Sequence, residues 1–191
     1  MSLIVNHLNK WAFVHIPKTG GSSLSKLLLQ QEGSEKVSTH GDLGLFQNIN
    51  DYFIFTIVRN PFTRLASAYL HKSREGFNGN FSDFINSIYE FDFWYYPQTY
   101  FFNHNKTSNI EITHICKYEN YENDIKMLLN KLKIPFNKIP HENRNPIYNK
   151  HPNLKQQDYY KILYNNNVWA KEWVLDKYKN DFKLFNYELD I

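Results

Sequence analysis

One stretch near the start of the chain, residues 11–24, constrains the fold more than any other. Residues 11–16 are almost continuously apolar, which is typical of a buried strand. A short loop with a lysine and two glycines follows, and then a segment that opens on serines and is expected to be helical. Glycines allow a tight turn, and the first N–H groups of a helix, which lack intrahelical acceptors, bind anions. The sequence therefore predicts a strand, an anion-binding loop and a helix, as at the opening of an α/β nucleotide-binding fold.

The loop supplies several candidate ligands for a phosphate-like group, namely a mobile ammonium, hydroxyls and main-chain N–H groups. These candidates are Lys18, Thr19, Gly20, Gly21, Ser22 and Ser23. The loop is not a Walker A motif, because that motif places its lysine directly after the last glycine, whereas here the lysine precedes both glycines. This order disfavours a metal-dependent NTPase or kinase and leaves the anion site intact.

A second apolar run, residues 52–58, is rich in β-branched and aromatic residues and predicts a buried parallel strand. It leads into Arg59, and Pro61 suits the first position of a helix. Arg59 is therefore expected at the carboxyl end of a strand, where open α/β sheets bind ligands. Ser67 lies about two helical turns further on. An arginine fork and a hydroxyl can together hold a second phosphate.

The two motifs together resemble those of sulfotransferases that use 3′-phosphoadenosine 5′-phosphosulfate (PAPS). In that superfamily, a P-K-T-G-G-[ST]-[ST]-like loop after the first strand binds the 5′-phosphosulfate. A strand that ends in R-[ND]-P, with a serine eight residues after the arginine, binds the 3′-phosphate. Residues 15–24 and 57–69 show both patterns at the family's spacing, and residues 115–120 and 178–187 resemble later segments more weakly. The nearest resemblance is to carbohydrate sulfotransferases of the heparan-sulfate 2-O and 6-O kind and their bacterial relatives.

The resemblance implies PAPS as the donor, adenosine 3′,5′-bisphosphate as the product, and Lys18 as the group that offsets charge on the leaving bisphosphate. The acceptor hydroxyl must lose a proton, and a histidine suits that task. His40 is the predicted base, since it lies between the two cofactor strands, where related sugar sulfotransferases place a catalytic histidine; Asp42 is the next candidate. His15 is expected to be a partly buried structural residue. No metal is expected, because the sulfuryl group carries little charge to neutralise.

Two other segments bear on the site. Residues 135–152 form a long polar loop, and loops above about 12–15 residues are usually functional or disordered. It is interpreted either as a lid that brings Arg144 to the phosphates or as a disordered surface loop. Residues 91–102 are rich in aromatic side chains, most of which we expect to pack in a core, with residues 94–98 as the wall for the acceptor.

The composition of the 191-residue chain agrees with one α/β domain over residues 1–191, with a central parallel sheet flanked by helices. The 22 basic and 19 acidic side chains include no basic block that would indicate nucleic-acid binding. No apolar run approaches the roughly 20 residues of a membrane span, polar residues interrupt any secretory signal, and the one cysteine, Cys116, excludes an internal disulfide. These features predict a cytoplasmic protein, and the asparagine and lysine bias is typical of an AT-rich bacterial genome.

The apolar spacing and the helix-start residues also predict the remaining elements. Helices are expected over 22–31, 61–69, 121–133, 155–165 and 168–178, with a further helix capped by Ser82 and a short strand over 36–40.

Three classes of function remain open. The first is a PAPS-dependent sulfotransferase that acts on a carbohydrate or glycolipid hydroxyl. The second is a nucleotide-dependent phosphotransferase, which ATP turnover would favour. The third is a noncatalytic bisphosphate-binding module, which binding without transfer to any sugar would favour.

Overall fold

The computed structural model describes residues 2–38, 51–88, 92–103, 111–139 and 156–191. The chain forms two compact units. The first, which we call the sheet unit, comprises Met1–Arg59 and Gln98–Asn143. The second, the helical unit, comprises Asn60–Pro97 and Arg144–Ile191. Each unit has a hydrophobic core of its own.

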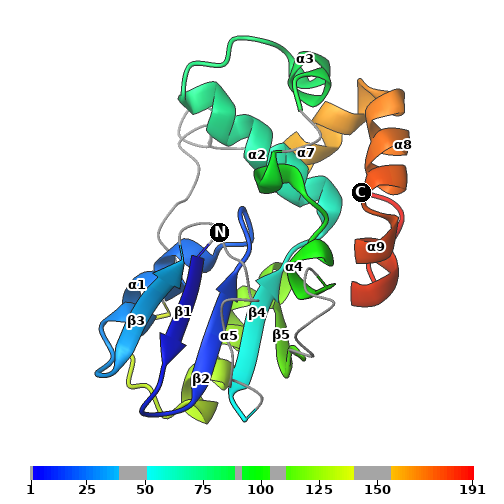
Figure 1. Cartoon of the computed structure of the whole chain (residues 1–191). Helices are drawn as coiled ribbons and strands as arrows, with labels where there is room; N and C mark the ends of the chain where they lie inside the picture. The colour runs from blue at the N-terminus through cyan, green and yellow to red at the C-terminus, as the bar shows by residue number, and fades with distance from the viewer. Residues whose placement is uncertain (1, 39–50, 89–91, 104–110, 140–155) are drawn as a thin grey trace. The chain divides into compact units, whose positions relative to one another are not determined.

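The described residues of the sheet unit form a mixed sheet with the strand order β3-β1-β2-β4-β5 (Figure 1). Its strands are β1 (Ser2–Asn6), β2 (Trp11–His15), β3 (Ser34–Ser38), β4 (Phe53–Val58) and β5 (His114–Lys117). Strands β2, β4 and β5 are parallel, whereas β1 runs antiparallel to both of its neighbours, β2 and β3. Strand β3 therefore points in the same direction as β2 and β4.

The mixed sheet corrects the prediction of a wholly parallel one. The strand expected to open the fold, residues 11–16, is the second strand, because β1 precedes it. The two strands form a hairpin in which Ser2 pairs with His15 and Asn6 with Trp11. Antiparallel neighbours need only a short turn between them, and residues 7–10 make that turn. This short strand is not among the elements predicted from the sequence.

Helices α1 (Gly21–Leu29) and α5 (Tyr121–Lys131) pack on one face of this sheet. Alternate strand residues point to one face, and on this face Phe13, Phe55 and Ile57 are fully buried. They share a core cluster with Leu24 of α1 and Leu128 of α5. Burying each such side chain stabilises the fold by about 1.5–3 kcal/mol. Short helices α4 (Tyr100–Asn103) and η3 (Tyr118–Asn120) lie before β5 and before α5 in the chain.

The helical unit is built around aromatic side chains. Its elements are α2 (Pro61–Arg74), α3 (Phe81–Asn86), η2 (Phe93–Tyr95), α7 (Gln156–Asn165), α8 (Val168–Lys177) and α9 (Lys179–Phe185). Two buried tyrosines satisfy their hydroxyls with carbonyl oxygens: Tyr164 donates to Phe62 O at 2.9 Å, and Tyr178 donates to Tyr95 O at 2.8 Å. The expected helix around residue 84 is present, but Asn80 caps it instead of Ser82.

Candidate functional site

The loop between β2 and α1 is held by its own contacts. Lys18 and Gly20 both have left-handed backbones, with φ of 68° and 86°, which turns the chain sharply between strand and helix. Thr19 is fully buried, and its hydroxyl donates a hydrogen bond to the carbonyl oxygen of Ile16 at 2.9 Å. Contacts within the loop therefore help to hold its shape, and the Thr19 hydroxyl has a structural partner inside it.

The two glycines are required by packing. A Cβ on Gly21 would lie 2.4 Å from Cδ2 of His15 and 2.9 Å from Cζ of Phe13. A Cβ on Gly20 would lie 2.8 Å from Cδ2 of Tyr118, and the positive φ disfavours a side chain there. The sequence predicted a tight turn at these glycines, and the structure adds a second reason for them, the close packing of α1 against β2.

The start of α1 offers a donor set that suits an anion. No described side chain caps this helix, whose N-cap is Gly20, and the first N–H groups of a helix have no intrahelical acceptors. The hydroxyl-bearing Ser22 is exposed, Ser23 is buried, and Lys18 is half-buried beside them. An ammonium, a hydroxyl and a helix N-terminus are the groups that bind phosphate and sulfate esters in proteins.

Arg59 lies beside this loop, as the sequence predicted. Strands β2 and β4 are parallel neighbours, with Val14 opposite Thr56, so the residues that follow them emerge at one edge of the sheet. The Arg59 guanidinium donates from Nη1 to the carbonyl oxygen of Lys18 at 3.3 Å. Its Cζ lies 3.9 Å from the centroid of the Tyr118 ring. Both partners are uncharged, so these two contacts orient the buried cation without neutralising it.

Three residues that sequence reasoning did not assign to this site also support it. Tyr118 covers the Arg59 guanidinium, and the Tyr121 hydroxyl donates to Gly20 O at 3.3 Å. Gln98 accepts a hydrogen bond from Arg59 N–H at its Oε1 and donates from Nε2 to Arg59 O, both at 2.8 Å. Gln98 is fully buried, so it is not part of an exposed acceptor wall. In the sequence, residues 115–120 resemble a later segment of the family and residues 91–102 are rich in aromatic side chains. Neither pattern indicates these contacts.

His15 is a structural residue, as expected. Burial above all, and nearby positive charges to a smaller extent, lower its pKa to about 4, so the ring is neutral near pH 7. Its Nδ1 lies 3.3 Å from the Ser2 hydroxyl, and its ring stacks on Phe13. The His15 ring also packs closely against Gly21, the first residue of α1.

Four other residues were predicted to belong to the site. Ser67 is a half-buried residue of α2, in the helical unit. His40, Asp42 and Arg144 lie outside the described residues.

Strand β3 ends at Ser38, which the register aligns with Leu3 and, across β1, with Val14. The chain therefore leaves β3 two residues before position 40, at the same sheet edge from which the Lys18 loop emerges.

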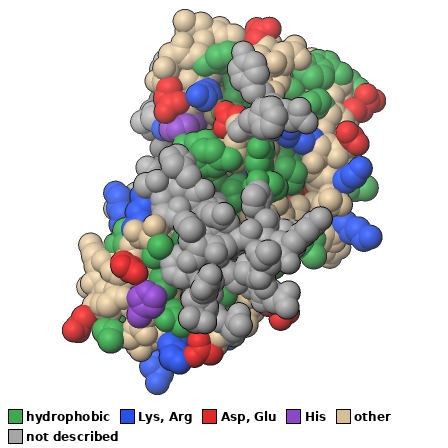
Figure 2. Space-filling model, in the orientation of Figure 1, with side chains coloured by type: hydrophobic (Ala, Val, Ile, Leu, Met, Phe, Trp, Pro, Cys, Tyr) green, Lys and Arg blue, Asp and Glu red, His purple; other side chains and the backbone are tan. Residues whose placement is uncertain are grey.

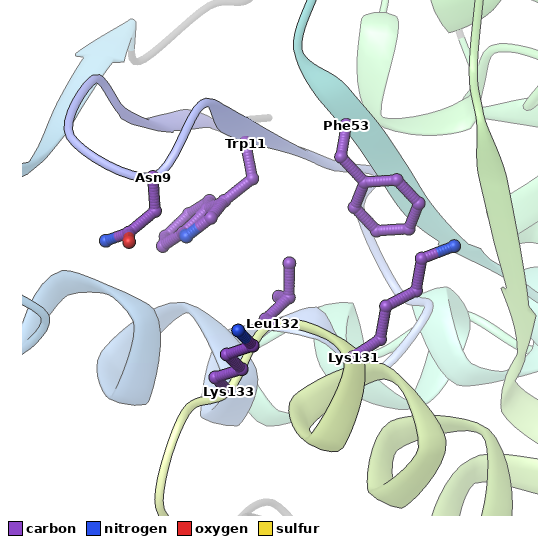
Figure 3. A pocket seen from close by; sticks show the side chains of 6 residues that line it. All are labelled: Asn9, Trp11, Phe53, Lys131, Leu132 and Lys133. Carbon is purple, nitrogen blue, oxygen red and sulfur yellow. The ribbon is translucent and has the colours of Figure 1, made fainter.

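A pocket of about 300 Å³ lies at the opposite ends of the same strands (Figure 3). Its lining residues are Asn9, Trp11, Phe53, Lys131, Leu132 and Lys133. Trp11 and Phe53 are the first residues of β2 and β4, so the pocket is separated from the strand ends by roughly 13 Å of strand. The ammonium of Lys131 lies 4.2 Å from the centroid of the Phe53 ring. None of the predicted site residues lines this pocket.

On the visible face, acidic and basic side chains of the described residues are interspersed (Figure 2). Within the described ranges, no group of three His, Cys, Asp or Glu side chains is arranged to hold a metal ion. In the same part of the chain, no helix is long and apolar enough to cross a membrane.

Comparison with known proteins gives the class. A family model described as "Sulfotransferase family" matches residues 1–188. The chain belongs to the sulfotransferase family, which implies a transferase enzyme and sulfuryl transfer. It is also 30% identical over 86 residues to an uncharacterized protein of Archaeoglobus fulgidus, a match that covers 44% of this chain and 70% of that protein. No solved structure is a significant match.

Proposed function

We propose that this chain transfers a sulfuryl group from PAPS to a hydroxyl of a carbohydrate or glycolipid. The observation that carries the proposal is the contact between the Arg59 guanidinium and the Lys18 carbonyl, at the ends of two neighbouring parallel strands. This contact supports the proposal because the two motifs that resemble cofactor-binding motifs follow strands that end at one edge of the sheet, where open α/β sheets bind ligands. The family defines the reaction class, and the spacing of the two motifs indicates the donor.

The binding roles follow from the donor set. The start of α1, with Ser22 and Ser23, holds the 5′-phosphosulfate. The Lys18 ammonium donates a hydrogen bond to the oxygen that bridges phosphorus and sulfur, where negative charge grows as the bond to sulfur breaks. Arg59 and Ser67 hold the 3′-phosphate. Because the sulfuryl group passes between oxygens in line, positioning and charge stabilisation supply most of the rate, by analogy with phosphoryl transfer.

His40 is the proposed base that removes the proton of the acceptor hydroxyl. The direction of β3 supports this role, because that strand delivers the chain to the sheet edge of the Lys18 loop just before residue 40. Asp42 is the alternative base, and Arg144 a further phosphate ligand.

The two units together are proposed as one sulfotransferase domain over residues 1–191, which is supported by a family model that spans both. No metal is required in this mechanism, since the transferred group carries little charge. A cytoplasmic location stays a prediction from the composition.

Calorimetric titration with adenosine 3′,5′-bisphosphate tests the proposal. Arg59→Ala removes a charge-assisted contact and is expected to weaken binding roughly 10- to 150-fold. Arg74→Ala, which removes an exposed arginine of α2, is the matched control and leaves affinity unchanged. Unchanged affinity in Arg59→Ala, or equal affinity of the wild type for adenosine 5′-phosphate, overturns the assignment.

Two assays separate the other classes of function. Turnover of ATP that is lost on chelation with EDTA and restored by magnesium would indicate a phosphotransferase. Tight bisphosphate binding, with no transfer from radiolabelled PAPS to any oligosaccharide or glycolipid, would indicate a noncatalytic module. The proposed sulfotransferase transfers the label and keeps its activity in EDTA.

A further inference from the structure

The carboxamide of Gln98 pairs with both main-chain polar groups of Arg59. Its Oε1 accepts from the N–H of Arg59 and its Nε2 donates to the carbonyl of Arg59, both at 2.8 Å. In an antiparallel ladder, a directly opposite residue makes the same two-bond exchange with its main chain. The last register pair between β4 and β5 is Val58 with Lys117. The Gln98 amide thus binds both main-chain polar groups of the first residue after β4.

The residue that receives this pairing is the one whose side chain carries the proposed phosphate contact. Contacts with the Lys18 carbonyl and the Tyr118 ring orient the Arg59 head group, while Gln98 holds the main chain from which the side chain departs. A tilt of about 10° there displaces a guanidinium roughly 6 Å away by about 1 Å, and a misplacement of that size can cost about 100-fold in rate. In these contacts, the main chain of Arg59 and its head group are held by different residues.

We propose that Gln98 is a positioning residue for the 3′-phosphate site and acts on it through Arg59. This inference rests on the proposed function, because it takes Arg59 as the ligand of a nucleotide 3′-phosphate. An amide is suited to the role since it is both a donor and an acceptor. Methionine has a similar length and supplies neither group as a strong partner, so Gln98→Met removes the pairing while it keeps most of the side-chain volume.

The test compares the affinity for adenosine 3′,5′-bisphosphate with that for adenosine 5′-phosphate, which lacks the 3′-phosphate. The wild type prefers the bisphosphate, and Gln98→Met is expected to reduce this preference about tenfold, with the affinity for the monophosphate unchanged. In the Arg59→Ala background, Gln98→Met has no further effect. Gln31→Met is the matched control, because the Gln31 side chain also donates to a main-chain carbonyl, that of Leu27 in α1, and it leaves the preference intact.

Other outcomes overturn the inference in distinguishable ways. If Gln98→Met weakens both nucleotides equally, or weakens bisphosphate binding further when Arg59 is already absent, Gln98 does not act through Arg59. Gln98→Asn, whose amide is one methylene too short to make both bonds, is the second variant if Gln98→Met does not fold. If neither variant folds, Gln98 serves the fold alone. A wild type with no preference for the bisphosphate overturns the proposed function itself, and this role with it.

Discussion

One helix follows β2 in the chain and another follows β4. Their first turns differ in what accepts hydrogen bonds from the N–H groups that have no intrahelical acceptor. At the start of α2, the Asn60 side chain accepts from Phe62 N–H at 2.9 Å. The first helical residue is Pro61, which has no N–H to satisfy. At the start of α1, the N-cap is a left-handed Gly20, and no side chain in the described part of the chain caps the helix. The second helix start satisfies its donors locally, whereas the first can offer donors to a ligand.

Under the proposed function, the contrast implies that one strand-to-helix step can bind an anion in two ways. After β2, the main chain and Lys18 would provide the donors, from a loop in which two glycines are required by packing. After β4, the N-cap Asn60 occupies the helix start, so the proposed anion contact falls to the side chain of Arg59, one residue before that cap. An alanine at Asn60 and an alanine at Gly21 should therefore have different consequences.

The largest expected effect is on the rate of transfer, and it comes from the proposed base and not from either helix start. If the residues at the two strand ends bind only the nucleotide, removal of the base should leave the affinity for the nucleotide unchanged. His40→Ala is expected to lower the rate of sulfuryl transfer by about 10²–10⁴, with unchanged calorimetric affinity for the bisphosphate. The pH–rate profile should also lose the limb that reports the ionisation of the base. His7→Ala, at an exposed position, is the control. A His40→Ala rate within tenfold of wild type would contradict the role.

A second prediction concerns the two parallel strands themselves. One residue beyond their last register pair, Val14 with Thr56, β2 has the titratable His15 and β4 has the apolar Ile57. Burial lowers the pKa of His15 to about 4, whereas in the unfolded chain it is near 6.5. The unfolded state therefore binds more protons between these values. The contribution of the neutral His15 ring to the free energy of unfolding is complete above pH 6.5. It declines by about 2–3 kcal/mol as the pH falls to 4.

Urea unfolding at several pH values across this range measures the decline. His15→Gln should flatten the dependence of the free energy of unfolding on pH, and an equally steep dependence in that variant would show that His15 is not the cause.

A third prediction concerns the residue that seats α1. Gly21→Ala forces a methyl group against the His15 ring, and overpacking of this kind costs about 1–3 kcal/mol. At the same position in α2, the chain accommodates the ring of Pro61. Ser22→Ala, at the neighbouring exposed residue, should leave the free energy of unfolding near the wild-type value. Equal stability of Gly21→Ala and wild type would show that α1 can shift away from β2 without cost.

The smallest effect is at the start of α2. Asn60→Ala removes the cap of Phe62 N–H, and such losses cost about 1 kcal/mol. If the helix start serves only the fold, bisphosphate affinity stays near the wild-type value while the midpoint of urea unfolding falls. Asn123→Ala, at an exposed position inside α5, controls for the loss of an asparagine. A large drop in affinity with Asn60→Ala would break the comparison, since it would make this helix start part of the nucleotide site.

Most elements could be predicted because local patterns define them. The helices expected over 121–133 and 168–178 appear as Tyr121–Lys131 and Val168–Lys177, and the strand expected over 52–58 appears as Phe53–Val58. Apolar spacing and the proline at a helix start depend on neighbours along the chain. The strand Ser2–Asn6 was missed because its five residues carry no periodic signal longer than one short apolar run.

The sequence by itself determined the class of protein and the two motifs proposed to bind the donor, because Lys18 with its glycines and Arg59 with its proline are recognisable over a dozen residues each. Only the tertiary structure decided what holds them. Gln98 pairs with a residue 39 positions earlier, and the Tyr121 hydroxyl reaches Gly20 across 101 positions. Such contacts depend on which strands become neighbours and on which side chains the core buries. No local pattern encodes them, since a glutamine in an aromatic run and a tyrosine at a helix start are compatible with many partners.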